Sequence, residues 1–99
     1  MMLNLLRFRD GGRDSYSSYS RALGTTFLTR YSGEVLYAGD GSTTLVAGDG
    51  QSWDAVLLVR YPSRAAFTKM VADPEYQQVT YLRTEALHEA VLHATAPWT

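Results

Sequence analysis

Cysteine is missing from this chain of 99 residues. Its absence excludes disulfide bonds, thiolate metal sites, iron–sulfur clusters and a cysteine nucleophile, and it fits a reducing compartment. An excess of one charge is missing too, because the formal net charge is −1 and acidic and basic residues are spread along the chain. Without a basic stripe or a cationic amphipathic segment, we expect no nucleic-acid partner and no binding to a membrane surface.

Long apolar runs are also lacking. No stretch approaches the roughly 20 apolar residues of a membrane-spanning helix, and the apolar run at the N-terminus is too short and too interrupted for a secretory signal. We therefore expect a soluble, cytoplasmic protein. The sequence also lacks the phosphate-binding, dinucleotide-binding, zinc-protease and serine-hydrolase signatures GxxxxGK[ST], GxGxxG, HExxH and GxSxG.

The chain has the composition of a small globular domain. Hydrophobic residues make up 45% of it, and its length leaves room for one domain, residues 1–99, and no second core. A domain of this size buries only about 60–65% of its unfolded surface, so it is marginally stable alone. We expect further burial against a second copy.

The spacing of apolar residues predicts strands and helices in alternation. Tyr16, Tyr19 and Leu23 recur at helical spacing, with Asp14 as the expected N-cap. We interpret Tyr16 and Tyr19 as packing between this helix and the sheet. Two copies of Ala-Gly-Asp-Gly, nine residues apart, are interpreted as tight turns around a short strand, because a single repeat cannot build a calcium-binding β-roll. The predicted strands are 2–8, 34–38, 42–46 (short), 53–61 and 88–94; the predicted helices are 15–31 and 63–83, the latter divided at Asp73-Pro74.

This order predicts an α+β fold of ferredoxin-like βαββαβ type. Two right-handed βαβ units give a four-stranded antiparallel sheet with both helical regions on one face. The other face would then expose more apolar surface than a small monomer tolerates. Two sheets meeting face to face would cover it and could enclose a cavity, so we expect a homodimer, a dimeric α/β barrel.

The stretch that starts at Trp53, WDAVLLVRYPSRAAFTKMVADPEYQQVTYLRTEAL, resembles the DUF1330 family of the dimeric α/β-barrel superfamily. The matching pieces are Pro62-Ser63-Arg64 after an aromatic strand end, the corner Asp73-Pro74-Glu75-Tyr76, and Arg83. The resemblance implies a dimer and a pocket. It does not select a chemistry, because relatives in the superfamily include cofactor-free monooxygenases, isomerases, polyketide cyclases, haem proteins and ligand-binding modules. Residues 40–52 depart from the shorter pattern of the family.

Strand 53–61 supplies the first candidate residues, because its alternating side chains form two faces. One face is apolar and is expected to pack on the helices, and the other is mixed and is expected to border a pocket. On the mixed face Asp54 is a candidate general base, and Arg60 could hold substrate oxygens. Alternatively, each is a solvated strand-end residue or pairs across a dimer. The mixed face consists of Asp54, Val56, Leu58 and Arg60.

Strand 2–8 supplies a second set. Asn4 is the polar member of an otherwise apolar row, and if buried it must form hydrogen bonds. It could orient a substrate oxygen, or it could bond to neighbouring backbone or water. We expect the apolar wall of the pocket to consist of Leu6, Phe8, Val56 and Leu58.

The remaining candidates are two histidines, a tyrosine and an arginine. His88 and His93 lie five apart on one strand and point to opposite faces, so either could be a general acid or base, but they do not form a metal site together. Tyr37 could donate a hydrogen bond to a developing oxyanion. Arg83 could bind a substrate carboxylate, or it could hold its helix to Glu85 or Asp73. The second helical region has no histidine, so we expect no haem.

Together these residues predict a cofactor-independent enzyme that acts by proton transfer, as an isomerase, cyclase or lyase, on an apolar oxygenated small molecule. The base would be Asp54 or a histidine. Two alternatives remain open: a cofactor-free monooxygenase of a phenolic substrate, and a non-catalytic dimer that binds a ligand or serves a structural role.

Overall fold

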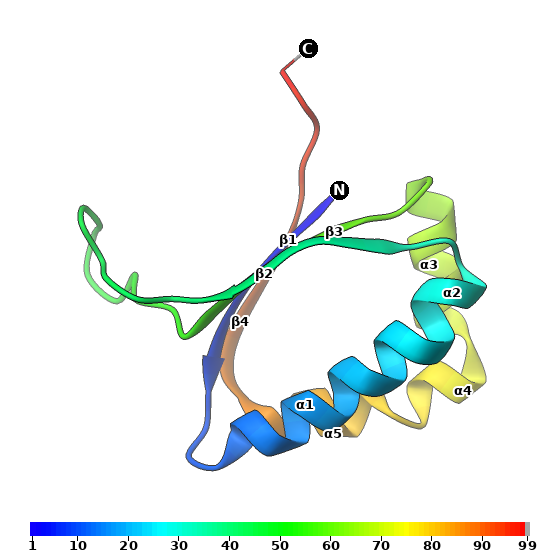
Figure 1. Cartoon of the computed structure of the whole chain (residues 1–99), viewed down its shortest axis with the longest axis horizontal. Coiled ribbons are helices and arrows are strands. Elements are labelled where there is room, and N and C mark those ends of the chain that lie inside the picture. Colours follow the sequence, from blue (N-terminus) through cyan, green and yellow to red (C-terminus); the bar gives the residue numbers. More distant parts are fainter. Residues whose placement is uncertain (99) are drawn as a thin grey trace.

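The computed structural model describes residues 1–98, and it has the expected α+β architecture (Figure 1). Four strands form one antiparallel sheet in the order β2-β3-β1-β4, and the helices cover one face of it. This is the ferredoxin-like βαββαβ arrangement that the sequence predicted. The elements are β1 (Met2–Phe8), α1 (Gly12–Ala22), a π-helical turn η1 (Leu23–Phe27), α2 (Leu28–Arg30), β2 (Glu34–Asp40), β3 (Ala55–Arg60), α3 (Arg64–Ala72), α4 (Pro74–Gln77), α5 (Thr80–Ala86) and β4 (Leu87–Ala94).

The first helix begins earlier than Asp14, the predicted N-cap. Gly11 takes a left-handed conformation (φ 71°), and the Gly12 N–H donates to the Arg9 carbonyl, so the chain turns into α1 at Gly12. Only glycine adopts such a backbone readily. The helix then runs on to Arg30 through η1, which contains the weak helix former Gly24.

The second helical region is divided into three short helices rather than the two that were predicted. Ser63 Oγ accepts a hydrogen bond from the Ala66 N–H and caps α3, and Asp73 Oδ1 accepts from the Glu75 N–H and caps α4. Pro74 at the first position of α4 has no N–H to lose. The second break, at Gln78 and Val79, was not predicted, because the sequence has no proline or glycine there.

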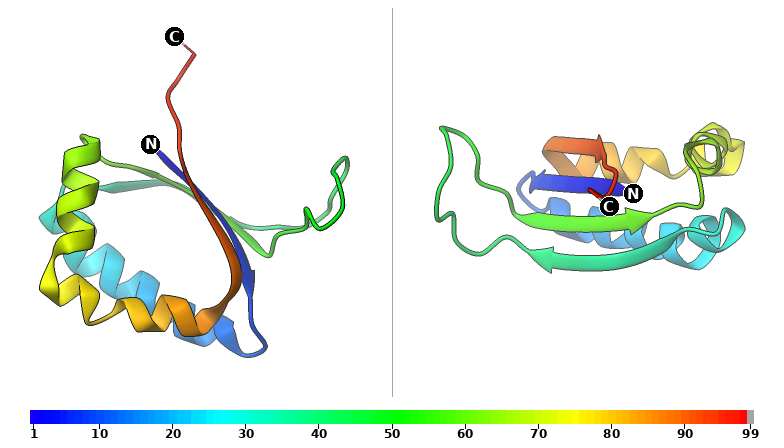
Figure 2. Two further views of the ribbon diagram at one scale, coloured as in Figure 1. Left: turned by 180° about the vertical axis from the view of Figure 1, so that it is seen from behind. Right: turned by 90° about the horizontal axis from the view of Figure 1, so that it is seen from above.

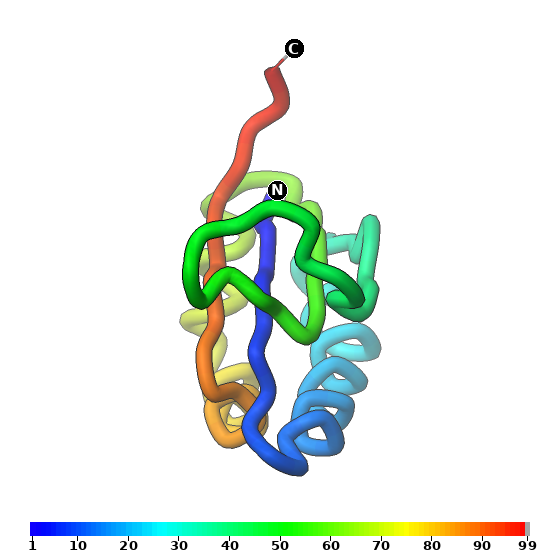
Figure 3. The backbone as a smooth tube through the Cα atoms, turned by 90° about the vertical axis from the view of Figure 1, so that its left-hand side faces the viewer, coloured from blue at the N-terminus to red at the C-terminus, as the bar shows by residue number. Residues whose placement is uncertain are grey.

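The predicted short strand at 42–46 is wrong. Residues 41–54 form an irregular loop that extends away from the helices, and Leu45 and Val46 at its tip are almost fully exposed (Figures 1 and 3). Residues 42–46 join no strand of the sheet, although the edge strands β2 and β4 each have one side without a partner strand. Residues 95–98 after β4 likewise leave the sheet as an extended tail (Figure 2).

The core lies between the helices and the inner face of the sheet, which is the face turned toward them. Leu6, Ala55 and Val59 project inward from the sheet and are buried. Aromatic side chains from α1, η1 and α4 pack against them, and Phe27 of η1 lies edge-on against Tyr76 of α4. The outer face of the sheet carries no helix (Figure 2). Among the residues that the structure describes, no helix is long and apolar enough to cross a membrane.

Candidate functional site

A pocket of about 350 Å³ lies between the inner face of the sheet and the helices. Its floor is apolar and includes Leu57 and Val59 of β3 and Met70 of α3. Gln77, Thr84 and Leu92 line it as well but are exposed, so they mark its mouth between the short helices and β4. A mostly apolar cavity of this size, with a few polar groups, is the usual form of a small-molecule site.

Tyrosine hydroxyls supply the deepest polar groups of the pocket. The Tyr19 and Tyr76 side chains come from α1 and α4, and their hydroxyl oxygens are 2.7 Å apart. These two residues are only 4% and 6% exposed. Within the pair one O–H donates to the other oxygen, so the hydroxyl that accepts keeps its own proton for another acceptor. That proton is available to an oxygen of a ligand.

Burial keeps these phenols protonated. It raises the pKa of Tyr16 and, more strongly, that of Tyr19, where the Tyr76 hydroxyl adds to the effect. Burial also raises the pKa of Tyr61, which lines the same pocket, to about 12. A phenol with a raised pKa stays neutral at physiological pH and acts as a hydrogen-bond donor rather than as a base.

Arg83 is the one charged side chain among the described residues that line the pocket. It comes from α5, is partly buried, and lowers the pKa values of Tyr16 and Tyr19 by its positive charge, against the larger effect of burial. Asp73, one of its expected partners, instead accepts hydrogen bonds from Arg30 and Tyr31, each at 2.7 Å. Over residues 1–98 no carboxylate lies within ion-pair distance of Arg83.

Asn4 also lines this pocket, so two of the predicted substrate-binding residues, Asn4 and Arg83, lie in one cavity. Asn4 projects from the inner face of β1 opposite Leu57 of β3 and Leu92 of β4. Asn4 therefore belongs to the part of the pocket wall that the sheet forms. The pleat of β1 explains this position, because Asn4 shares its face with the fully buried Leu6.

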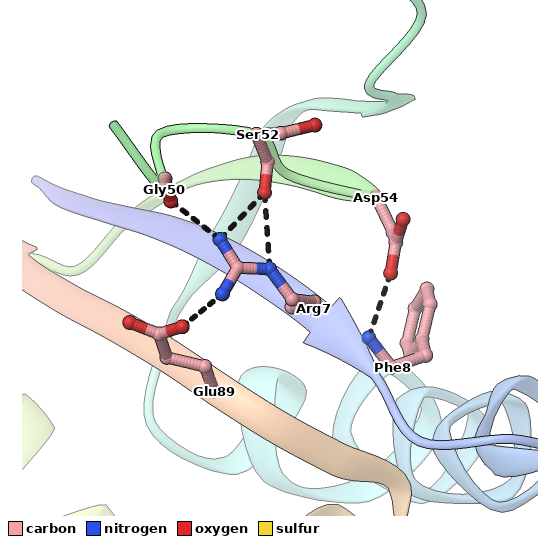
Figure 4. A network of polar contacts seen from close by, with 6 residues as sticks. All are labelled: Arg7, Phe8, Gly50, Ser52, Asp54 and Glu89. Atoms are coloured by element: carbon pink, nitrogen blue, oxygen red, sulfur yellow. Dashed lines mark hydrogen bonds and ion pairs between the residues drawn. The ribbon is translucent and has the colours of Figure 1, made fainter. Parts of the chain in front are cut away.

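Asp54, the predicted base, lies elsewhere, just before β3 (Figure 4). Its carboxylate accepts a hydrogen bond of 2.9 Å from the Phe8 N–H and so joins the end of β1 to the root of the loop 41–54. Beside it, Arg7 donates to the carbonyls of Gly50 and Ser52 and pairs with Glu89 (Figure 4). Asp54 is exposed and borders an open hollow beneath the loop, not the pocket described above.

The other predicted polar residues are outside the pocket as well. Arg60 forms an exposed ion pair of 2.7 Å with Glu34, which corresponds to the structural alternative for that residue. Tyr37 is 58% exposed on the outer face of β2. His88 and His93 are exposed on the edge strand β4. Within the described part of the chain, no group of three or more His, Cys, Asp or Glu residues could hold a metal ion.

The predicted apolar wall of Leu6, Phe8, Val56 and Leu58 is wrong as a single surface. In the register of β1 and β3, Leu5 is opposite Val56 and Leu3 is opposite Leu58. Opposed residues share a face, so Val56 and Leu58 belong to the outer face, whereas Leu6 and Phe8 belong to the inner one. Leu6 is a fully buried core residue.

Four tyrosines line the pocket although they were not predicted from the sequence to belong to the site: Tyr16, Tyr19, Tyr61 and Tyr76. Tyr16 and Tyr19 were interpreted as packing between helix and sheet, and both are indeed buried. The same side chains nevertheless line the pocket, together with Tyr61 and Tyr76. Seven tyrosines in 99 residues was the available signal, because a buried tyrosine needs a partner for its hydroxyl.

Comparison with known proteins places this geometry in a family. The model of DUF1330, a domain of unknown function, matches residues 5–95. No curated protein matches. The methylated RPA0582 protein is 32% identical with a TM-score of 0.88, and the alignment covers 99% of this chain and 79% of that one. A second structure of RPA0582, from Rhodopseudomonas palustris and described as a protein of unknown function, is 29% identical with a TM-score of 0.87 and covers 99% and 81%.

More distant structures share the fold alone. A putative antibiotic biosynthesis monooxygenase from Bacteriodes thetaiotaomicron is 18% identical with a TM-score of 0.65, and the alignment covers 99% of this chain and 88% of that one. A protein from Bacteroides fragilis, described as dimeric, of unknown function and with a ferredoxin-like fold, is 12% identical with a TM-score of 0.60 and covers 93% and 89%.

Proposed function

This chain belongs to the DUF1330 family, a domain of unknown function, and we propose that it binds a small, mostly apolar, oxygenated molecule in the pocket between sheet and helices and catalyses a proton transfer on it. The reaction would be an isomerisation, a cyclisation or a lyase step that passes through an enolate. The observation that carries this proposal is the buried pair of phenols, Tyr19 and Tyr76, which can offer one free O–H to the cavity.

The phenols would act by stabilising negative charge on a substrate oxygen. When a carbon next to a carbonyl loses a proton, charge develops on the carbonyl oxygen, and preorganised donors in a site shielded from water lower the barrier to that step. The raised pKa values of Tyr16 and Tyr19 support this role, because a donor must keep its proton. Asn4 could hold a second oxygen of the substrate.

The residues that were predicted to act as the base do not line this pocket. Asp54, His88 and His93 were expected to accept the proton, but the pocket wall contains neither a carboxylate nor an imidazole among its described residues. A substrate that suits this pocket would therefore be acidic enough to lose a proton to water. A compound with a CH₂ group between two carbonyl groups is an example. The protein would contribute the oxyanion donors rather than the base.

The same reasoning supports a cofactor-free monooxygenase as a second candidate. A substrate anion held by phenols in an apolar cavity could react with dioxygen directly. In such a step a CH₂ group becomes a carbonyl, dioxygen supplies its oxygen atom, and the second oxygen atom leaves as water. The observation that favours this candidate is again a pocket rich in donors and without a base.

The test is hydrogen–deuterium exchange at the central carbon of cyclic 1,3-diketones, followed by NMR in deuterated buffer with an oxygen electrode on a parallel sample. We expect Tyr76→Phe to slow the protein-dependent exchange roughly 100–1000-fold. Tyr81→Phe is the matched control, because Tyr81 is 56% exposed and is not part of the pocket. Oxygen consumption with product formation would select the monooxygenase, and exchange unchanged in Tyr76→Phe would refute both candidates.

We also propose that two copies pair through the outer face of the sheet. Leu3, Leu5, Val56 and Leu58 lie together on this face, and no helix of the chain covers them. The Bacteroides fragilis protein of the same fold is described as dimeric, which supports the proposal. Light scattering should give twice the 11.0 kDa of one chain. Leu58→Arg should halve that mass, and Ser18→Arg on the exposed side of α1 should not.

A further inference from the structure

Among the arginines of residues 1–98, only Arg7 and Arg83 are partly buried, and of these two only Arg7 has a carboxylate partner, Glu89. Arg7, Arg30 and Arg60 each pair with a carboxylate, and Arg9 donates to the Leu87 carbonyl. Arg83 has no such partner among residues 1–98, although it is partly withdrawn from water and stands in the wall of a cavity. A guanidinium cannot lose its proton in a protein, so the positive charge of Arg83 remains and is left to interact with solvent or with a ligand of the cavity.

The surroundings of Arg83 suit an anionic oxygen and not a second protein group. Thr80 and Thr84 lie beside it on α5, at spacings that place all three side chains on one face of the helix, and all three line the pocket. The phenols of Tyr16 and Tyr19 on α1 line the same pocket, and they lie close enough to Arg83 for its charge to lower their pKa values. The groups facing Arg83 are thus neutral donors and acceptors.

We propose that the ligand of this pocket carries one anionic oxygen group, a carboxylate or an ionised enol, on an apolar body, and that Arg83 binds it. This inference rests on the proposed function and names its substrate class. Arg83 would hold the anionic group with its planar fork of N–H donors. The free hydroxyl of the Tyr19–Tyr76 pair would meet a second oxygen, and the apolar floor at Leu57 and Val59 would cover the hydrocarbon part.

The experiment is calorimetric titration of the full chain with three probes that share a fused bicyclic ring skeleton of ten carbons. The probes are 2-naphthoate (a carboxylate), 2-hydroxy-1,4-naphthoquinone (an ionised enol) and 2-naphthylmethanol (neutral). For the wild type we expect at least one anionic probe to bind roughly tenfold or more tightly than the alcohol, because hydrogen bonds to charged groups are worth about twice the neutral ones. Which anion binds better distinguishes a carboxylate from an enol substrate.

Variants then assign that preference to Arg83. In Arg83→Gln the anionic probes should bind no better than the alcohol, while the affinity for the alcohol stays the same. Arg83→Lys keeps the charge without the fork and should retain part of the preference, which keeps the test open if the glutamine variant does not fold. Arg64→Gln, an exposed arginine of α3 outside the pocket, is the matched control and should bind like the wild type.

The outcomes separate this inference from the proposed function. Equal binding of all three probes to the wild type would overturn the anionic class and leave the pocket standing. A preference that persists in folded Arg83→Gln would overturn the assignment to Arg83. No binding of any probe would refute the proposed small-molecule site and this inference with it.

Discussion

The contact between α1 and the end of α5 is so close that a single added methyl group tests it. Gly12 is the first residue of α1, and a Cβ built on it would lie 2.1 Å from the Ala86 carbonyl oxygen and 2.9 Å from the carbonyl carbon. Carbon and oxygen normally approach no closer than about 3.3 Å. Both partners are backbone, so neither can rotate away, and Gly12→Ala has to push α1 and the end of α5 apart.

The expected cost follows from this displacement. Relieving the clash requires a shift of about 1 Å in elements that are otherwise closely packed, and overpacking of this kind costs about 1–3 kcal/mol. That is a large share of the free energy of unfolding of a domain this size, about 5–15 kcal/mol. The shift also moves Tyr16 and Tyr19, which project from α1 into the pocket. We therefore expect weaker ligand binding as well as lower stability.

Gly24→Ala is the matched control. It makes the same chemical change within the same continuous helical segment, but a Cβ at Gly24 has no atom within 4 Å. There the alanine only restricts the unfolded chain and should stabilise the protein by about 0.4–1 kcal/mol. Urea unfolding at equal slope measures both changes as shifts of the midpoint. A Gly12→Ala variant as stable as the wild type would refute the steric argument.

Three further predictions concern the polar groups of the fold. Tyr19→Phe and Tyr76→Phe should each destabilise the protein by about 1–3 kcal/mol, and the double variant by less than the sum, because either single change leaves one buried hydroxyl without its partner; additive effects in urea unfolding would contradict the hydrogen bond. The Tyr31 hydroxyl and the Arg30 guanidinium lower the pKa of Asp73 from 3.8 to about 2. Because the folded pKa is below the unfolded one, this carboxylate stabilises the fold fully above about pH 4, and that contribution is lost as the pH falls toward 2. Asp73→Asn should thus melt below the wild type at pH 7 and converge with it near pH 2, and a gap that is constant with pH would disprove the assignment. Arg7→Gln should speed proteolytic cleavage within residues 41–54, because Arg7 holds the Gly50 and Ser52 carbonyls, whereas Arg60→Gln, which removes an ion pair between β2 and β3, should leave cleavage there unchanged.

Local patterns in the sequence were sufficient for the fold class and for most of its strands and helices. The alternation along β3 correctly indicated that Ala55 and Val59 face the helices. Ser63 and Asp73 cap α3 and α4 because short polar side chains can bond to nearby backbone N–H groups. The loop 41–54 was misjudged because a strand needs a partner, and no local pattern shows whether a free sheet edge will be within reach.

The candidate site was only partly predictable, for a related reason. Asn4 and Arg83 were identified from their residue types, and the fold brings them to one cavity. Asp54 was predicted to be a base because of its position on a mixed strand face. Its carboxylate instead accepts a hydrogen bond from the Phe8 N–H. Whether a polar side chain is free or already bonded depends on residues far away in the chain, and these the sequence does not place.

By itself the sequence determined where the four strands of the sheet and the two helical regions form, because their periods of two and 3.6 residues are local properties of the chain. The tertiary structure alone decided which faces meet. The register that sets Leu5 opposite Val56 divides the predicted wall between the two sides of the sheet. The same packing places buried tyrosines in the wall of a pocket and leaves Arg83 without a carboxylate partner among residues 1–98. Such pairings arise between residues distant in sequence, so they exist only once the chain has folded.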